Sequence, residues 1–456
     1  MEQNKMGVMP VNKLIINMSL PMIISMLVQA LYNIVDSIFV AMINEQALTA
    51  VSVAFPAQNL MIAVATGTAV GVNALVSRSL GEKNSDKANK ISENGIFLAL
   101  LSYIVFLIFG IFGSRPFIAS QTDVAQIIDY GTEYLSIVSG VSFGIFFEII
   151  FERLLQATGR TFYTMITQGV GAIFNIVFDP IFIFVFKMGV KGAAVATVLG
   201  QIVAAILAII FNMKKNPEIT LNIKKFRPNG KLIGMIYAIG VPSIIMVAIG
   251  SVMTYCMNKI LVAYTAGKET AVTVFGAFFK LNSFICMPIF GLNNGIIPII
   301  AYNYGAKNRD RMVKAIKLST IYAEIFSVIG ALLFLCIPKT LLGFFSASEK
   351  MLEIGIPALR IVGTSFIFAG TCIALGAAFQ ALGKSLFSMV VSLIRQLVVL
   401  TPAAFLLARY GMQIGNDNLV WFSYPIAEIS SLTVSIICFV RLYKTVIKNV
   451  ENKYAP

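Results

Sequence analysis

Residues 14–43 read LIINMSLPMIISMLVQALYNIVDSIFVAMI, a run of thirty residues in which Asp36 is the only charged side chain. Residues 162–186 form a second such run, and Asp179 is the only charged side chain there. A carboxylate at membrane depth is costly unless it is neutralised, paired or hydrated, so it marks an ion or proton path by default. These two aspartates are therefore the first candidates for a functional site.

The composition is that of a polytopic α-helical membrane protein. Hydrophobic residues make up 58% of the chain and charged residues 12%, whereas a soluble domain carries about 25% charge. An apolar run of about 20 residues spans the hydrocarbon core of a bilayer. The first run is too long for a cleavable signal peptide and lacks its small-residue cleavage site. We expect twelve transmembrane helices, at about 14–43, 51–77, 91–113, 127–151, 162–186, 192–213, 233–263, 271–300, 316–337, 354–382, 386–408 and 419–440.

The positive charge is concentrated in alternate loops. The net charge is +14, but the basic residues follow the positive-inside pattern of cytoplasmic loops with both termini inside. We therefore expect contacts with anionic membrane lipids and no nucleic-acid partner. The residues that carry this pattern are Lys83, Lys87, Lys90, Lys214, Lys215, Lys224, Lys225, Arg227, Lys231, Lys307, Arg309, Arg311, Lys314 and Lys317.

Several classes of chemistry are disfavoured. The chain has no histidine, so proton coupling would depend on carboxylates. It has no Gly-x-x-x-x-Gly-Lys-Ser/Thr motif for ATP and no cytoplasmic domain, so we expect neither an ATP-driven pump nor an enzyme, and no cofactor. The five cysteines lack metal-ligand spacing and read as small apolar residues; they are Cys256, Cys286, Cys336, Cys372 and Cys438.

The chain is an internal duplication. Shifted by about 224 residues, Gly71–Gly81 falls on Gly295–Gly305, and Gln156-Ala-Thr-Gly159 falls on Gln380-Ala-Leu-Gly383. Each half holds six predicted spans, so both halves enter the membrane from the same side. Such parallel repeats typically enclose a substrate path and alternate access by rocking. We expect an N-lobe at 1–213, a cytoplasmic linker at 214–232 and a C-lobe at 233–456.

These residues resemble a known family, the multidrug and toxic compound extrusion (MATE) transporters. The likeness covers nearly the whole chain and is closest to the DinF-like, MepA-like branch. It implies a V-shaped pair of six-helix lobes that exports drugs in exchange for protons or sodium, as in multidrug efflux and antibiotic resistance. The motifs that carry it are Leu20-Pro21, Val35-Asp36-Ser-Ile-Phe-Val, Gly81-Glu-Lys-Asn84, Gln156-Ala-Thr-Gly159 and Asn175-Ile-Val-Phe-Asp179-Pro180.

The resemblance implies a cation-coupling site in the N-lobe, formed by Asp36, Asn175, Asp179 and Thr197. Depth can be compared independently of the family. The two aspartates lie seven residues before the outer ends of their spans, and Thr197 lies about five residues into the sixth span. At 1.5 Å per residue, all three sit roughly 8–10 Å inside the outer boundary. Asn175 precedes Asp179 by four residues and shares its helix face.

The oxygen ligands of such a site suit either of two coupling ions. Two carboxylates, an amide and a hydroxyl suit Na⁺, which is the only metal ion we consider. Desolvation and like-charge proximity also favour the protonated form of a carboxyl, and a close pair titrates as a unit. The residues leave H⁺ and Na⁺ open. The alternative is that Asn175 and Asp179 merely tie helices together.

Further positions are assigned to a substrate cavity and to helix kinks. Gln29 and Tyr32 share one face of the first span with Asp36, and the resemblance opens that face, together with Glu148, on the cavity. Glu148 has an alternative role as an ion-pair partner of Arg153. Kinks are expected at Pro21 and Pro180, where the missing backbone N–H loosens the helix.

The second half carries basic residues inside its spans. Lys259, Lys280, Arg360 and Arg395 have Glu324 and Glu428 as candidate partners. They are expected either to form buried ion pairs that fix helix packing or to line a cavity for an anionic or zwitterionic substrate. The NorM-like branch of the family places acids in the seventh and tenth spans; here Asn258 stands near the first position, which argues against a C-lobe cation site of that type.

The sequence therefore predicts a monomeric, secondary active multidrug antiporter of a bacterial cytoplasmic membrane. Its substrates would be drugs that are organic cations or amphiphiles, moved by rocking lobes against H⁺ or Na⁺. The alternative is a flippase for lipid-linked oligosaccharide or another amphiphilic lipid, because related families of twelve to fourteen spans share the architecture.

Overall fold

The computed structural model describes residues 4–222, 226–265, 268–345 and 347–450. Within those ranges the regular elements are all helical, as the apolar runs predict. The first half begins with α1 (Lys5–Val8) and α2 (Val11–Ala41). It continues with α3 (Glu45–Gly81), α4 (Ser85–Ile108), η1 (Phe109–Gly113), α5 (Ser114–Ala119), α6 (Ala125–Gly140), α7 (Phe143–Ala157), α8 (Thr161–Pro180), η2 (Ile181–Val185) and α9 (Val190–Lys215).

The second half repeats this order of long and broken helices. It starts with the two longest members, α10 (Gly230–Tyr264) and α11 (Lys268–Gly305). The rest are α12 (Arg309–Cys336), α13 (Pro338–Gly343), α14 (Glu349–Gly363), α15 (Phe366–Ala381), α16 (Ser385–Leu393), η4 (Ile394–Leu400), α17 (Thr401–Ile414), η5 (Asp417–Phe422), α18 (Ser423–Leu442) and η6 (Tyr443–Ile447).

Two of the predicted spans are broken. The described residues contain 10 helices that are long and apolar enough to cross a membrane by themselves, and up to 12 spans when two bent pairs are included. The pair α6 and α7 is bent by 45°, and the pair α14 and α15 by 51°. These breaks fall at Gly140-Val-Ser142 and Gly363-Thr-Ser365, so the same repeat position is bent in both halves. Glycine and serine together are a recognised cause of helix kinks.

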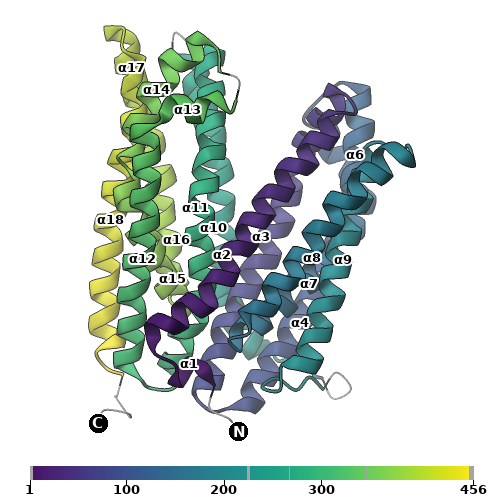
Figure 1. Cartoon of the computed structure of the whole chain (residues 1–456), viewed down its shortest axis with the longest axis vertical. Coiled ribbons are helices and arrows are strands. Elements are labelled where there is room, and N and C mark those ends of the chain that lie inside the picture. Colours follow the sequence, from purple (N-terminus) through teal and green to yellow (C-terminus); the bar gives the residue numbers. More distant parts are fainter. Residues whose placement is uncertain (1–3, 223–225, 266–267, 346, 451–456) are drawn as a thin grey trace.

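The two lobes form a V (Figure 1). They meet at the lower end of the view and diverge toward the upper end, where α17 and α14 of one lobe stand apart from α6 of the other. Helix α1 and the yellow C-terminal end of the chain lie at the same, closed end.

Glycines bring the lobes into backbone contact along a crossed seam. Helix α3 packs against α10, and α11 packs against α2, so the second helix of each repeat contacts the first helix of the other. A Cβ added at Gly71 would lie 2.4 Å from the carbonyl oxygen of Ile236, and one at Gly295 would lie 2.7 Å from the Cα of Ser19. Small residues of this kind let membrane helices approach closely. The seam therefore depends on repeat-equivalent glycines.

The seam is tightest at the closed end. Gly81 ends α3 and Gly305 ends α11, and they are equivalent positions of the two repeats. A Cβ at Gly81 would lie 2.0 Å from the carbonyl oxygen of Tyr302, and one at Gly305 would lie 2.0 Å from the carbonyl oxygen of Arg78. The ends of the two helices thus lock against each other across the pseudo-symmetry axis.

The turns that follow these glycines are also duplicated. Lys83 and Lys307 both adopt positive φ angles, of 57° and 55°. Each precedes an asparagine that caps the next helix: Asn84 Oδ1 accepts a hydrogen bond from the backbone of α4, and Asn308 Oδ1 from that of α12. Asparagine is among the preferred helix N-caps.

The segment between the lobes lies along α4. The backbone N–H of Thr220 donates to Asn89 Oδ1 at 2.9 Å, and that of Asn229 donates to Asn94 Oδ1 at 2.9 Å. Because α9 ends at Lys215 and α10 begins at Gly230, the described connection is shorter than the expected 214–232 by a few residues at each end.

Candidate functional site

Three N-lobe helices bring the four predicted cation-site residues together. Helix α8 packs between α2 and α9, and it carries Asn175 and Asp179 on one face. The carboxyl group of Asp179 lies beside that of Asp36 on α2. Asp179 is completely buried, and Asn175 and Thr197 are nearly so.

Asn175 links Asp179 to α9. With its amide nitrogen facing Asp179, Nδ2 donates to Asp179 Oδ2 at 2.8 Å and the amide oxygen accepts from the backbone N–H of Thr197 at 3.2 Å. The hydroxyl of Thr197 lies 3.3 Å from the same amide. The asparagine thereby fixes the orientation of one carboxylate and leaves its other oxygen free.

The two carboxylates are not fully satisfied by the protein. Asp36 Oδ1 and Asp179 Oδ1 are both buried without a hydrogen-bond partner in the part of the chain that the structure describes. Two carboxylates in contact cannot both be charged without a large repulsive cost, and an unpaired buried charge costs several kcal/mol more. The arrangement therefore fits one shared proton or one monovalent cation held between the oxygens.

The backbone changes helix type next to this pair. The α-helical pattern of α8 ends at Pro180, and the π-helix η2 follows directly. Proline has no N–H to donate to the preceding turn, and π-helical turns occur frequently at functional sites. Pro21 behaves differently, because α2 continues through it as one helix.

The predicted cavity residues occupy different environments. Tyr32 lies close enough to Asp36, Glu148 and Asp179 to be affected by their charges. Gln29, one turn nearer the closed end of α2, is exposed. Tyr32 therefore lies near the acid pair.

Two neighbours of the site were not anticipated. Tyr134 on α6 lies near enough to Asp36 and Asp179 to feel their charges, and its hydroxyl lies 3.5 Å from Gln58 Oε1 on α3. The depth argument could have found both, since Gln58 and Tyr134 each lie seven residues inside the outer boundary of a predicted span.

Another buried acid of the N-lobe, Glu152, has hydrogen-bond partners within the protein. Glu152 on α7 is 3% exposed and accepts hydrogen bonds from Thr167 Oγ1 at 2.5 Å and Gln168 Nε2 at 2.7 Å. Its partners lie on α8, so this acid joins α7 to the helix that carries Asp179.

Arg153 bonds across the seam. Its Nη1 donates to Gln156 Oε1 and, on α11 of the other lobe, to Asn294 Oδ1, both at 2.9 Å. The alternative partner that we considered for Arg153, Glu148, does not take these bonds. Arg153 thus ties the two lobes together near the closed end.

The basic residues of the C-lobe do not share one role. Arg395 Nη1 lies 3.3 Å from Glu428 Oε1, so these two residues form an ion pair, although both side chains are only partly buried. Glu324 instead accepts hydrogen bonds from Thr371, from the backbone N–H at 3.1 Å and the hydroxyl at 2.9 Å. The Lys259 ammonium lies 5.7 Å above the ring of a neighbouring tyrosine.

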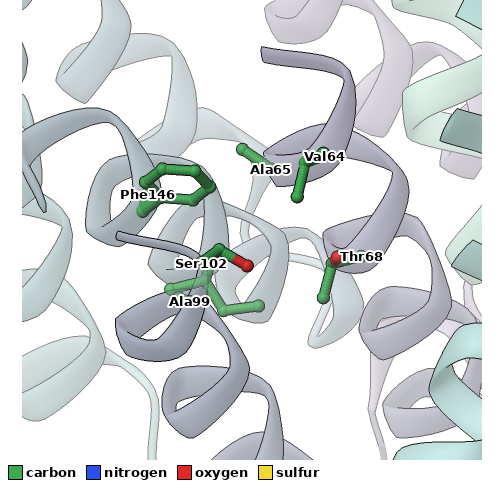
Figure 2. Close-up of a pocket in the computed structure, with 7 residues that line it drawn as sticks. Val64, Ala65, Thr68, Ala99, Ser102 and Phe146 are labelled. Atoms are coloured by element: carbon green, nitrogen blue, oxygen red, sulfur yellow. The ribbon is translucent and has the colours of Figure 1, made fainter. Parts of the chain in front are cut away.

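A small pocket inside the N-lobe is too small for a drug. Figure 2 shows Val64, Ala65, Thr68, Ser102 and Phe146 around it. Its volume is about 10 Å³, comparable to the space that a single water needs.

Comparison with known proteins assigns the family. The MatE family model matches the chain twice, at residues 21–181 and 242–406. The chain is 28% identical over 430 residues to the multidrug export protein MepA of Staphylococcus aureus strain MRSA252, covering 92% of this chain and 91% of that protein. It is 26% identical to MepA of Staphylococcus haemolyticus over 91% of this chain and 90% of that protein.

Solved structures agree on the fold. An outward-facing MATE transporter of the MOP superfamily matches with a TM-score of 0.91 at 23% identity, over 98% of this chain and 99% of that one. A MATE structure in complex with MaL6 gives the same TM-score at 24% identity. The two family-model matches cover most of both lobes, including α8 with its aspartate and the glycines of the seam. The chain is therefore a member of the MATE family of membrane transporters.

Proposed function

We propose that this protein is a secondary active multidrug exporter that couples efflux of organic cations and amphiphiles to inward movement of H⁺ or Na⁺. The observation that carries the proposal is the contact between Asp36 and Asp179, each with one buried oxygen that lacks a protein partner. Membership of a transporter family and similarity to proteins named as multidrug exporters support the choice of drugs as cargo.

The lobes would alternate between two packings. With both termini inside, the closed end of the V is cytoplasmic and the open end faces outward. A proton or Na⁺ entering from outside lowers the negative charge of the acid pair and removes the repulsion between the two carboxylates of α2 and α8. The helices repack, cargo leaves the cavity beside Tyr32, and release of the ion on the inner side resets the cycle.

The membrane potential limits what such an exchange can do. One charge that moves inward across 100 mV supplies about 2.3 kcal/mol. At about 1.4 kcal/mol per tenfold ratio, this sustains roughly a fifty-fold gradient of a neutral drug. A monovalent cationic drug exchanged one-for-one gains nothing from the voltage, because the charge transfer cancels, and it would depend on the chemical gradient of the ion.

The test is ethidium transport in proteoliposomes with an imposed ion gradient. We expect ethidium movement under a pH gradient or a Na⁺ gradient, measured separately, and none when both are collapsed. The double variant D36N/D179N should reduce transport to the level of empty liposomes, while Ser37→Ala, an exposed neighbour on the same helix, should leave it unchanged. Gradient-independent ethidium movement, or full activity of the double variant, would contradict the proposal. Lipid scrambling without dye transport would favour the flippase.

A further inference from the structure

The C-lobe contains a large cavity apart from the acid pair. Its volume is about 500 Å³, within the range of small-molecule sites. Its walls come mainly from α10, α11, α15, α16, η4 and α18, with one residue each from α14 and from α3 of the N-lobe. Much of the lining consists of flexible or aromatic apolar side chains, among them Met246, Met253, Met287, Phe278, Phe290 and Phe366. Thioether and aromatic groups together suit a planar apolar ligand.

An ion pair forms part of the cavity wall. Arg395 Nη1 and Glu428 Oε1 are 3.3 Å apart, and both residues line the cavity. The side chain of Glu428 is 12% exposed and that of Arg395 is 29% exposed. An arginine and a carboxylate commonly pair through two parallel hydrogen bonds, but here the pair makes one long contact.

Four buried polar atoms of the lining have no partner among the described residues: Asn293 Oδ1, Tyr424 Oη, Glu428 Oε2 and Ser431 Oγ. Tyr424 is 8% exposed and lines the same cavity. An unsatisfied buried acceptor costs about 1–3 kcal/mol, and more when it is charged. A ligand that donates to Glu428 Oε2 would remove that cost.

We propose that this cavity binds zwitterionic amphiphiles, which carry a carboxylate and a cationic or N–H donor group on an apolar ring system. The ligand carboxylate accepts hydrogen bonds from the Arg395 guanidinium, whose five N–H donors are only partly used by Glu428. The ligand's donor group binds Glu428 Oε2, and its rings pack on the methionines and phenylalanines. This inference rests on the proposed function and names a substrate class for it.

The charges on the wall disfavour simpler ligands. A purely cationic ligand meets Arg395 beside the acid that it would bind, and a purely anionic one meets Glu428 beside the arginine. A zwitterion gives each buried charge a second partner of opposite sign, which offsets the desolvation that makes a lone buried ion pair a weak stabiliser. We therefore expect a ligand with a carboxylate to bind this cavity more tightly than the same ligand without one.

The test compares two dyes that differ in that group alone: a rhodamine free acid, which is zwitterionic, and its methyl ester, which is cationic. Binding of each dye to the purified full chain in detergent is measured by fluorescence polarisation. In Arg395→Gln the affinity for the free acid should fall about ten- to a hundredfold, the range expected for 1.5–3 kcal/mol of charge-assisted hydrogen bonding. The affinity for the ester should stay the same or rise.

Two further variants make the result independent of folding. The paired variant R395Q/E428Q removes both charges, so no buried charge is left alone, and the ratio of the two dye affinities should approach one. Lys280→Gln changes an exposed basic residue of α11 outside the cavity lining and should keep the wild-type ratio. Because a ratio is compared, a partly unfolded sample does not imitate the effect.

The outcomes separate this inference from the proposed function. An unchanged dye ratio in both arginine variants overturns the zwitterion site, even when ethidium export is normal. Absence of ethidium export from proteoliposomes overturns the proposed function, even when the dye ratio shifts as expected. A tenfold or greater loss that is confined to the free acid supports the assignment of this cavity.

Discussion

The two lobes share a scaffold and differ in charge. Both use equivalent glycines at the seam, such as Gly71 and Gly295, and both break their fourth span at the same repeat position. The N-lobe then places Asp36 beside Asp179, and neither acid has an ion-pair partner among the described residues, whereas the C-lobe places Arg395 against Glu428. Packing has been retained between the repeats, and the electrostatics have diverged.

This difference implies a division of labour. The two charges of an arginine–glutamate ion pair balance each other, so the pair needs no further ion. Two carboxylates in contact repel each other unless a proton or a cation joins them. Under the proposed function, an ion from outside would therefore act at the N-lobe site, and the C-lobe would select the cargo.

The largest expected effect comes from removing either N-lobe acid. Asp36→Asn, Asp179→Asn and the double variant should each abolish gradient-driven ethidium transport, because residues that act as one unit are not additive. Transport rates in proteoliposomes, with the amount of folded protein measured by thermal unfolding, check this. Substantial activity in one single variant and none in the other would show that the aspartates act separately.

The second prediction converts the N-lobe site to the C-lobe type. Asn175→Lys places an ammonium one helical turn from Asp179, a spacing that allows an ion pair. We expect the chain to remain folded and coupled transport to be lost, because the lysine ammonium then supplies the positive charge that the external ion would bring. Asn175→Asp is the matched variant, which adds a negative charge at the same position. Normal coupled transport in the lysine variant would show that coupling does not depend on the acids lacking a cationic partner in the protein.

The third prediction concerns the feature that the lobes share. Gly81→Leu and Gly305→Leu should each destabilise the closed end by about 1–3 kcal/mol, the usual cost of overpacking, because an added Cβ meets a backbone carbonyl. Thermal unfolding in detergent measures the change. Gly169→Leu on α8, where an added Cβ meets nothing within 4 Å, is the control. Equal effects at all three positions would argue against a specific lock at the helix ends.

The smallest effect is expected at Glu82, whose repeat-equivalent position is Ala306. Burial alone would raise the pKa of Glu82, but hydrogen bonds from Lys87 and Arg78 lower the pKa overall. Their distances to the carboxylate are 3.0 and 2.9 Å. Because the pKa is lowered on folding, the stabilisation is present above the unfolded pKa of about 4.3 and is lost as the pH falls through the folded value.

Glu82→Gln should therefore lower stability by less than about 1 kcal/mol at neutral pH, as for other partly exposed ion pairs. The difference from wild type should vanish below about pH 4, where the glutamate itself is protonated. Unfolding temperatures at the two pH values test the sign. A difference that grows toward low pH would show that the wild-type glutamate is not stabilised as an anion.

Much of this architecture follows from patterns in the sequence. Hydropathy and the duplicated Gly-x-Lys-Asn turns predict the helices and the repeat, and equal depth groups Asp36 with Asp179 and Thr197. Depth in the membrane does not tell which way a side chain faces around its helix. The position of Tyr134 near the aspartates therefore becomes visible only once the packing of α6 is known. The bond from Arg153 to Asn294 joins residues 141 positions apart in different lobes, which local spacing cannot reveal. Glu428 rather than Glu324 as the partner of Arg395 likewise depends on tertiary packing.

The crossed seam also constrains how the protein is made. When α3 has been synthesised, its glycine face has no partner until α10 emerges from the ribosome. In the same way, the surface of α2 that contacts α11 stays uncovered until α11 has been made. The nascent first half must therefore hold an unfinished surface in the bilayer, in contact with lipid or an insertion chaperone, until the second half displaces it. A chain that stops in the linker therefore leaves the glycine face of α3 without its partner helix.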